Sequence, residues 1–332
     1  MTDELYSGDA GDLENDREIT AKFSRDELVR GWREREPRSP RFAPVVKFGL
    51  KTDLGRIREN NEDKSDFYEP EDPTLLATRG CFYAVADGMG GHAAGQIASE
   101  LALKNVIAHY YDSLTEDIAT ALLEAIFGAN ATVYNLAVMI PERSGMGTTL
   151  TAAVVAEDRV YIGQVGDSRG YLIRDGEIRQ VTFDHSWVAE QVRMGVLTPE
   201  EAGSSPYRNV ITRSIGTQAQ VEPDVFVEEA RVGDIWVLCS DGLTGHVEDE
   251  EIRLIASTQP PTEAARQLIE LANSRGGRDN ITVLVFSIRG MIAGTEQVSD
   301  AANIGDPSGV RQTVLGTKGE TSRRGLKRIF GK

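Results

Sequence analysis

Cysteine is scarce in this sequence: Cys81 and Cys239 are the only two in 332 residues, and they lie far apart. This number excludes a small fold held together by disulfides, which needs several closely spaced cysteines. Each cysteine stands beside an apolar, strand-like run, where a free thiol behaves as a small hydrophobic side chain. We therefore predict two buried free thiols in a reducing compartment.

Long apolar runs are also absent. No stretch approaches the ~18–20 consecutive apolar residues that cross a bilayer as a helix, so the sequence predicts no transmembrane segment. Residues 1–16 are acidic and have neither the basic nor the apolar region of a signal peptide. The resulting expectation is a cytoplasmic protein.

The excess of acidic side chains lies in the middle of the chain. The net charge is −16, and residues 45–290 alone carry 37 acidic and 21 basic side chains. Such a field repels the phosphates of nucleic acids and argues against a nucleic-acid partner. Two explanations stay open at this point, solubility or acidic residues clustered around cations. Nothing in the sequence indicates an oligomeric state.

Composition divides the chain into three parts. Residues 1–44 are polar and end in a stretch rich in proline and arginine, which predicts a largely disordered N-terminal extension. Residues 45–290 have the apolar patterning of one globular domain. Residues 291–332 lack periodicity and end in a basic tip at 322–330. A disordered tail is expected there, and a contact with an acidic partner or a membrane surface is the alternative.

The periodicity of the globular part predicts an α+β fold. Helical spacing occurs at 97–107, at 118–133 with a capping box at Ser113 and Glu116, and at 262–273. Strand patterns occupy 82–86, 150–156, 160–165, 170–174, 178–182, 235–239 and 281–288. The turn pairs Glu157–Asp158 and Asp175–Gly176 predict consecutive hairpins, hence antiparallel sheet. Helices grouped between blocks of strands favour α+β over a doubly wound fold.

One segment, residues 184–216, interrupts this pattern. It contains a second capping box, which begins at Thr198 and has Pro199 at the first helical position. We predict a small, partly helical excursion from the globular domain.

Acidic residues stand where several predicted strands end or begin. Apolar strands run directly into an aspartate with glycine or serine beside it, and other acids flank the remaining strands; these acids are Glu62, Asp63, Asp87, Asp167, Asp241 and Asp279. Hard cations such as Mg²⁺ or Mn²⁺ require oxygen ligands of this kind. A single Asp-Gly pair is more often a hairpin turn, as predicted for Asp175–Gly176. The combination, together with the glycine-rich turn at 87–92, is what favours a metal site.

Seven short motifs carry a family resemblance. In order they are Arg58 with Asn61–Glu62–Asp63, then Asp87–Gly88–Met89–Gly90–Gly91–His92, Gly147–Thr148–Thr149, Gly166–Asp167–Ser168–Arg169, Asp184–His185–Ser186, Ser240–Asp241–Gly242 and Asp279–Asn280. This series resembles that of the type 2C metal-dependent protein phosphatases, most closely the bacterial branch that opposes Ser/Thr kinases. The match covers residues 45–290, and seven motifs in one order are a specific signal. The resemblance implies a four-layer α-β-β-α sandwich of two antiparallel sheets with helices outside, and a flap at 184–216 over the cleft.

The resemblance also implies two metal sites for Mn²⁺ or Mg²⁺. Asp87 would bridge two ions, and the carbonyl of Gly88 would bind one of them. Asp241 and Asp279 would complete the second site, with Glu62–Asp63 contributing mostly through water. Glycine suits position 88 because the backbone must approach the ion closely.

A third, weaker metal site and a phosphate-binding arginine follow from the same resemblance. Asp167 would support the third ion together with Asp241. Arg58 would grip the substrate phosphate, a task that suits its guanidinium fork. Arg58, Asp87 and Asp241 are therefore the expected catalytic residues.

The implied activity is hydrolysis of phosphoserine and phosphothreonine in proteins by water activated between two metal ions. A Ser/Thr kinase and its targets are plausible substrates. A cysteine-dependent mechanism is excluded because the arginine expected six residues after its cysteine is replaced by Asp87 or Gly245. The acid that protonates the leaving oxygen stays open between His92 and a water on a metal.

Two alternatives remain at this point. A phospho-binding, regulatory pseudo-phosphatase on the same scaffold would require a lost metal ligand, and none is missing. A phosphatase of a partner-switching system would commonly lack an arginine like Arg58 and much of the Asn61–Glu62–Asp63 motif, and both are present.

Overall fold

The computed structural model describes residues 42–91 and 93–293. The predicted extension up to residue 41, the tail from residue 294 and His92 lie outside the described residues. The first described strand starts at Phe42 and the last ends at Ala293. The described fold therefore includes residues 42–44 and 291–293, which the sequence patterns place in the extension and the tail.

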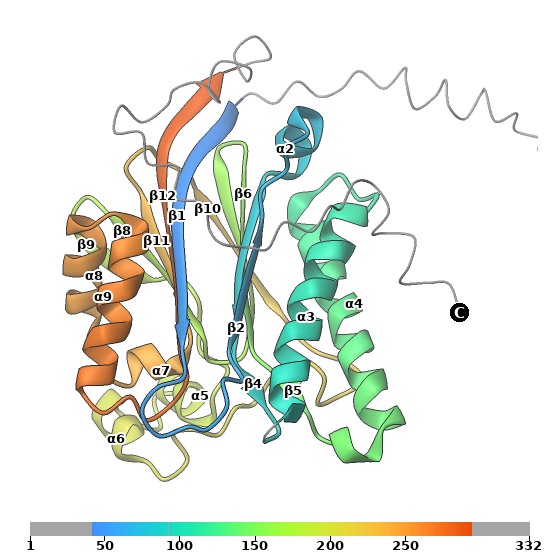
Figure 1. The fold of residues 1–332 in the computed structure, drawn as a ribbon, viewed down its shortest axis with the longest axis vertical. Helices are drawn as coiled ribbons and strands as arrows, with labels where there is room; N and C mark the ends of the chain where they lie inside the picture. The colour runs from blue at the N-terminus through green and yellow to red at the C-terminus, as the bar shows by residue number, and fades with distance from the viewer. Residues whose placement is uncertain (1–41, 92, 294–332) are drawn as a thin grey trace, which may run out of the picture. The chain divides into compact units, whose positions relative to one another are not determined.

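Two five-stranded antiparallel sheets form the centre of the fold (Figure 1). The first sheet has the order β1 (Phe42–Asp53), β12 (Ile281–Ala293), β11 (Ile235–Cys239), β8 (Arg169–Arg174) and β9 (Glu177–Gln180). The second has the order β10 (Asp224–Glu229), β7 (Arg159–Val165), β6 (Leu150–Ala156), β3 (Cys81–Ala86) and β2 (Lys64–Tyr68). A short third pairing joins β4 (Gly88–Met89) to β5 (Gly147–Thr148).

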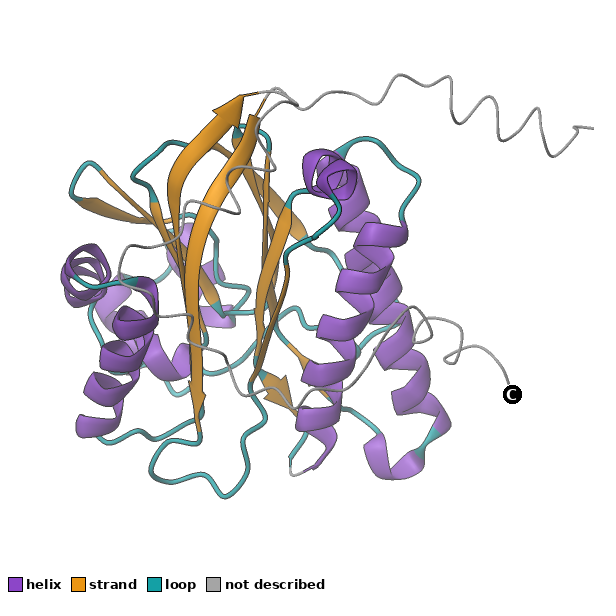
Figure 2. Cartoon of the chain, turned by 45° about the horizontal axis from the view of Figure 1, so that its top comes forward, coloured by secondary structure: helices purple, strands orange, loops and turns teal. Residues whose placement is uncertain are grey.

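Helices cover the outer faces of both sheets (Figure 2). On the second sheet lie α3 (Ala93–Asp112) and α4 (Ile118–Met139), and on the first lie α8 (Asp249–Thr258) and α9 (Pro261–Ser274). The shorter helical elements are α2 (Pro73–Arg79), the 3-10 turn η1 (Pro141–Arg143), α5 (Trp187–Arg193), α6 (Pro199–Ser204) and α7 (Asp241–Thr244). The predicted α+β class and four-layer sandwich are confirmed.

Each pair of adjacent layers encloses its own hydrophobic core. Between the sheets, Tyr83 stacks on Phe286 with ring centroids 5.0 Å apart, and Trp236 stacks on the same ring at 6.0 Å. Aromatic side chains of this size contribute the largest apolar areas to a core. The strands at this interface are buried on both faces because helices cover the other side. Such strands read as continuous apolar runs, which is why the sequence patterns reveal them.

The structure corrects two details of the sequence prediction. The turn at Glu157–Asp158 joins β6 to β7, and the turn at Asp175–Gly176 joins β8 to β9, but these hairpins belong to different sheets. They are therefore not a continuous series. Helix α4 starts at Ile118 with Asp117 as its N-cap, so the predicted capping box at Ser113 is wrong.

Other local predictions hold. The capping box at Thr198 is formed, with Pro199 as the first residue of α6. Cys81 and Cys239 are both free and buried. Helix α4 is long and apolar enough by composition to cross a membrane. Its buried side chains, however, pack into the core beneath α3, as expected for a central helix of a globular domain.

Candidate metal centre

The acidic residues of the sequence motifs lie at one end of the sandwich, the lower end in Figure 1. Antiparallel pairing places them there. Lys64 pairs with Ala86, so Asp63 and Asp87 are neighbours at the same sheet end. On the other sheet, Cys239 pairs with both Val283 and Arg169. The residues after β11, before β12 and before β8 therefore meet, and they carry Asp241, Asp279 and Asp167.

The carboxylate of Asp63 is held at the base of this group. Asp63 is 1% exposed, and its Oδ2 accepts a hydrogen bond from the Ser240 hydroxyl at 2.7 Å. The same hydroxyl accepts from the backbone N–H of Thr282 at 3.0 Å. Ser240 thus ties the loop before β2 to the end of β11 and the start of β12.

Asp87 is positioned through its backbone. Its carbonyl accepts two hydrogen bonds, one from the Thr149 N–H and one from the Thr148 hydroxyl, each at 2.8 Å. Its own N–H donates to Thr149 Oγ1 at 2.9 Å. All polar backbone atoms of Asp87 are therefore engaged, and its side chain is left to face the other acids.

The pKa values of four of these aspartates, Asp63, Asp87, Asp167 and Asp241, are raised. Burial raises the pKa of Asp87 well above its usual range, and the charges of Asp63, Asp241, Asp167 and Asp279 raise it further. Burial is also the main cause that raises the pKa values of Asp63 and Asp167 to about 7. Each carboxylate thus makes ionisation of its neighbours harder. Such a group is stable in its charged form when cations lie beside it.

Two buried carboxylate oxygens have no hydrogen-bond partner, Asp63 Oδ1 and Asp241 Oδ1. Buried oxygens of this kind are normally hydrogen-bonded or bound to a cation. Among residues 42–91 and 93–293, no three His, Cys, Asp or Glu side chains meet as a metal site built from side chains alone. Mg²⁺ and Mn²⁺ keep several waters and bind through few carboxylates, so the unpartnered oxygens fit a hydrated hard cation.

Arg58 and Asp279 form the exposed edge of the group. Arg58 Nη2 donates to Asp279 Oδ2 at 2.7 Å, and the two side chains are 52% and 37% exposed. The Asp279 carboxylate, through this hydrogen bond, raises the pKa of the guanidinium, and the charges of Glu62 and Asp87 add to the effect. Arg58 is therefore a cation in direct contact with one member of the acidic group.

Glycines let Glu62 and Gly88 approach the start of α3. A Cβ on Gly95 would lie 1.9 Å from Glu62 Oε2, and a Cβ on Gly88 would lie 2.2 Å from the Gly95 carbonyl. The Ser99 hydroxyl holds the Glu62 carbonyl at 2.6 Å. Only glycine fits at both positions, and this contact keeps the Gly88 backbone close to the acids.

Asp167 is anchored by a buried histidine. The N–H of Gly166, which has a φ of +102°, donates to His185 Nδ1 at 3.1 Å, and His185 Nε2 lies 3.1 Å from Asp224 Oδ2. These partners assign the neutral tautomer with its proton on Nε2. Burial lowers the pKa of His185, which keeps the ring neutral. His185 is thus structural.

The structure adds residues to which the sequence patterns assigned no role. Asn280 Oδ1 accepts from the Glu62 N–H, while its Nδ2 donates to the carbonyls of Leu54 and Asn60. Thr282 donates its N–H to the Ser240 hydroxyl that holds Asp63. Thr282 could have been singled out from the sequence, because it is a polar residue inside an otherwise apolar strand pattern. Nothing in the sequence marked Ser99, because serine is common on helices.

Every predicted site residue is thus found at this end, and the metal-ligand roles themselves stay predictions. The chain belongs to the protein phosphatase 2C family, whose model matches residues 72–275. The resemblance to the bacterial type 2C phosphatases is confirmed by the relatives that follow.

Two relatives and one crystal structure illustrate the similarity. The serine/threonine protein phosphatase PstP of Mycobacterium tuberculosis is 41% identical over 249 residues, which cover 75% of this chain and 46% of that protein. The serine/threonine phosphatase stp of Listeria innocua is 40% identical over 241 residues, 71% of this chain and 93% of that protein. The crystal structure of the PstP catalytic domain in complex with two manganese ions is 40% identical, covers 74% of this chain and 99% of that one, and has a TM-score of 0.64. The matched region thus spans about half the length of the mycobacterial relative.

Proposed function

We propose that this protein hydrolyses phosphoserine and phosphothreonine in other proteins, with Mn²⁺ or Mg²⁺ as cofactor. The observation that carries the proposal is the group of aspartates that raise one another's pKa, two of which keep a buried oxygen without a partner. Membership of the protein phosphatase 2C family supports the same activity. The pseudo-phosphatase alternative has no support, since every expected acid is in place.

Two metal ions would be held by the residues that the motifs predict. Asp87 would bridge them, with the Gly88 carbonyl on one ion and Asp241 and Asp279 on the other, while Glu62–Asp63 would act mostly through water. The two manganese ions of the PstP structure support this number. A third, weaker site would be formed by Asp167 and Asp241. Burial, and then the charge of Asp241, raise the pKa of Asp167.

When bound, the two cations would lower the pKa of a water and offset the negative charge of the phosphoryl oxygens. The chain's own side chains have separate tasks. Arg58, at the exposed edge of the group, would bind the phosphate oxygens and orient the ester for in-line attack. Ser240 and Thr149 hold Asp63 and Asp87 in place. His185 is buried against Asp224, so it is a poor candidate for the proton donor to the leaving oxygen.

Phosphoproteins, including a Ser/Thr kinase and its targets, are the proposed substrates. The names of the relatives, serine/threonine phosphatases, support this class. A cytoplasmic location is part of the proposal, and the unpaired thiols of Cys81 and Cys239 agree with a reducing compartment.

The test measures hydrolysis of p-nitrophenyl phosphate and of a phosphothreonine peptide by the full chain, with excess Mn²⁺ and with EDTA. Activity is expected only with the metal. Asp241→Asn should lower kcat by about 10²-fold or more, because it removes a ligand charge. Asp175→Asn is the matched control, since Asp175 has the same Asp-Gly pattern but forms a hairpin turn. Metal-independent activity, or equal activity of Asp241→Asn and wild type, would refute the proposal.

A further inference from the structure

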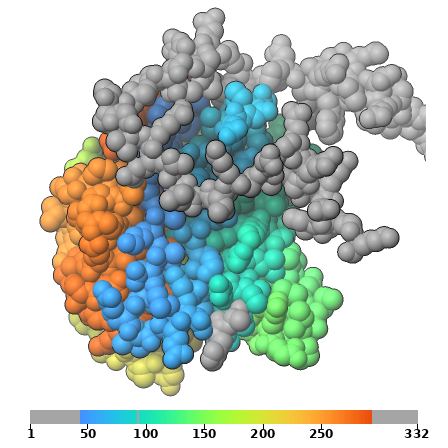
Figure 3. Space-filling model, in the orientation of Figure 1, coloured from blue at the N-terminus to red at the C-terminus, as the bar shows by residue number. Residues whose placement is uncertain are grey.

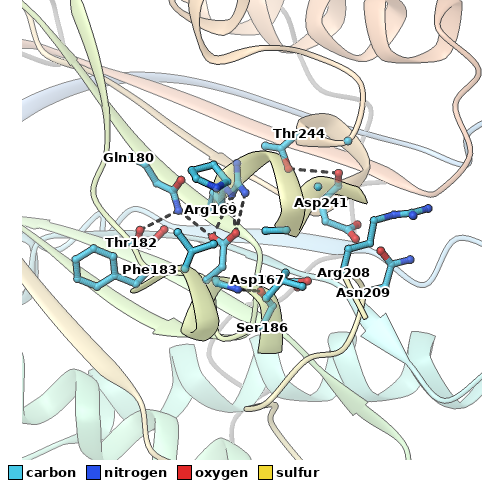
Figure 4. A pocket seen from close by; sticks show the side chains of 18 of the residues that line it. Asp167, Arg169, Gln180, Thr182, Phe183, Ser186, Arg208, Asn209, Asp241 and Thr244 are labelled. Carbon is cyan, nitrogen blue, oxygen red and sulfur yellow. Dashed lines mark hydrogen bonds and ion pairs between the residues drawn. The ribbon is translucent and has the colours of Figure 1, made fainter. Parts of the chain in front are cut away.

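A cavity of about 750 Å³ opens between the aspartate group and the 184–216 flap. Asp167 and Asp241 line its inner end, and α5 and α6 of the flap form its outer wall. Figure 4 shows Arg208 and Asn209 beside Asp241, with Arg169 and Gln180 at the far side. In Figure 3 the part of the flap around α6 forms the yellow surface at the lower edge. The cavity is thus continuous with the proposed reaction site.

Three aspartates and three arginines line the cavity, and they differ in their partners. Arg169 is neutralised by Asp184, to which it donates through Nε and Nη2 at 2.7–3.1 Å. Asp167 and Asp241 belong to the proposed metal centre. Within the described part of the chain, Arg193 and Arg208 have no ion-pair partner, and both are exposed. Two guanidinium groups are therefore left to meet an anion.

The flap wall between these arginines is apolar and firmly placed. Val188, Ala189, Val192, Pro199 and Ala202 line this side of the cavity. The two ends of the flap are joined by backbone hydrogen bonds of 2.8 Å, from Trp187 N to the Val210 carbonyl and from Thr212 N to the His185 carbonyl. A wall fixed at both ends can contribute to selectivity because little order is lost on binding.

We propose that this cavity binds an anionic side chain of the substrate polypeptide within a few residues of the phosphorylated serine or threonine. The aliphatic stem of the side chain would pack on the apolar wall, and its anionic end would meet Arg193 and Arg208. A glutamate or aspartate and a second phosphorylated residue share this chemistry. The inference rests on the proposed function and names the substrates that it favours.

The experiment compares kcat/KM, with Mn²⁺ and the full chain, for phosphothreonine peptides that carry alanine, glutamate or a second phosphothreonine at each flanking position in turn. At one position or more, the wild-type protein should prefer the anionic peptide over the alanine peptide by about fivefold. Arg208→Glu and Arg193→Glu should each reduce this ratio toward one. The ratio of kcat/KM for the anionic peptide to kcat/KM for the alanine peptide is decisive. A general loss of activity or of folded protein lowers both values by the same factor and leaves their ratio unchanged.

Arg289→Glu is the matched control, since Arg289 is exposed on β12 and does not line the cavity. It should keep the wild-type ratio. A preference for glutamate and phosphothreonine alike, or for phosphothreonine alone, supports the inference and identifies the source of the anion. A wild-type preference below about twofold at every position, or equal ratios for all variants, overturns it. Absence of any Mn²⁺-dependent hydrolysis, including that of p-nitrophenyl phosphate, would instead refute the proposed function.

Discussion

Ser240 offers a sharp test of how the acidic group is held together. Its hydroxyl donates to the buried Oδ2 of Asp63 and accepts from the Thr282 N–H. Asp63 and Ser240 are separated by 177 residues in the sequence, so this one hydroxyl joins distant segments. Ser240→Ala removes both hydrogen bonds and adds no bulk.

The loss of stability expected for Ser240→Ala follows from the two groups that lose a hydrogen bond, the Asp63 carboxylate and the Thr282 N–H. The other carboxylate oxygen of Asp63 already lacks a partner, so the substitution leaves the carboxylate with no hydrogen bond from the described residues. At about pH 8, above the raised pKa of Asp63, the carboxylate is largely ionised. A hydrogen bond to a charged group contributes about 1.5–3 kcal/mol, and an unsatisfied buried N–H costs about 1–3 kcal/mol. Because the site relaxes in part, we expect the free energy of unfolding of the metal-free protein to fall by about 2–4 kcal/mol.

Urea unfolding in EDTA measures this loss, and Ser274→Ala is the control. Ser274 also donates a hydrogen bond, to the Leu271 carbonyl at 2.7 Å, but at an exposed helix end, so its loss should change the free energy by less than about 0.5 kcal/mol. Ser240→Ala should also show a smaller rise in Tm on addition of Mn²⁺, because its ligands are less well placed. Equal stabilities of the two variants, both in EDTA and in Mn²⁺, would show that Ser240 does not organise the group.

Two further predictions concern the same end of the fold. In EDTA the raised pKa values of Asp63 and Asp167, about 7, mean that the folded state keeps protons which the unfolded state loses from about pH 4 upward. The free energy of unfolding should therefore fall as the pH rises from about 4 to 7, by at most about 1.4 kcal/mol per pH unit for each retained proton. Addition of Mn²⁺ should flatten this slope. A free energy of unfolding of the metal-free protein that increases over this range would contradict the cause we assign. Gly95→Ala should weaken Mn²⁺ binding and lower the free energy of unfolding by about 1–3 kcal/mol, because its Cβ would meet Glu62 Oε2 at 1.9 Å and the Gly88 carbonyl carbon at 2.8 Å. Gly203→Ala, where nothing lies within 4 Å of the added Cβ, is the control, and calorimetric titration with Mn²⁺ that gives equal affinities for both variants would be the contrary result.

Local sequence signals were enough for much of the fold. The apolar runs at 150–156 and 235–239 have the same bounds as β6 and β11, because turn-forming residues flank them. The predicted helix at 262–273 lies within α9, Pro261–Ser274. Each of these signals acts over a few neighbouring residues, as does the capping box at Thr198. Strand ends followed by aspartate also belong to this class, which is why the acids could be singled out.

Strand pairing was not available from such signals. The turns at Glu157 and Asp175 both begin with an acidic residue, and both residues have φ near +50° in the structure. The two turns nevertheless close hairpins in different sheets. Strand β1 pairs with β12, which comes from the other end of the described chain. The sequence pattern of β1 did not predict a strand. Pairing depends on which surfaces become buried together, and no window of neighbouring residues contains that information.

The sequence by itself determined the family of this protein, since ordered acidic motifs of this kind identify a phosphatase 2C family member, and it named the acids that we propose bind cations. The tertiary structure alone decided what surrounds them. Arg58 reaches Asp279 across 221 residues, and Asn280 reaches the Glu62 N–H across 218. The cavity, whose Arg193 and Arg208 have no ion-pair partner among the described residues, likewise exists only because the segment 184–216 lies beside Asp167 and Asp241. Contacts between such distant segments are set by packing of the whole domain, and so they appear only once the chain is folded.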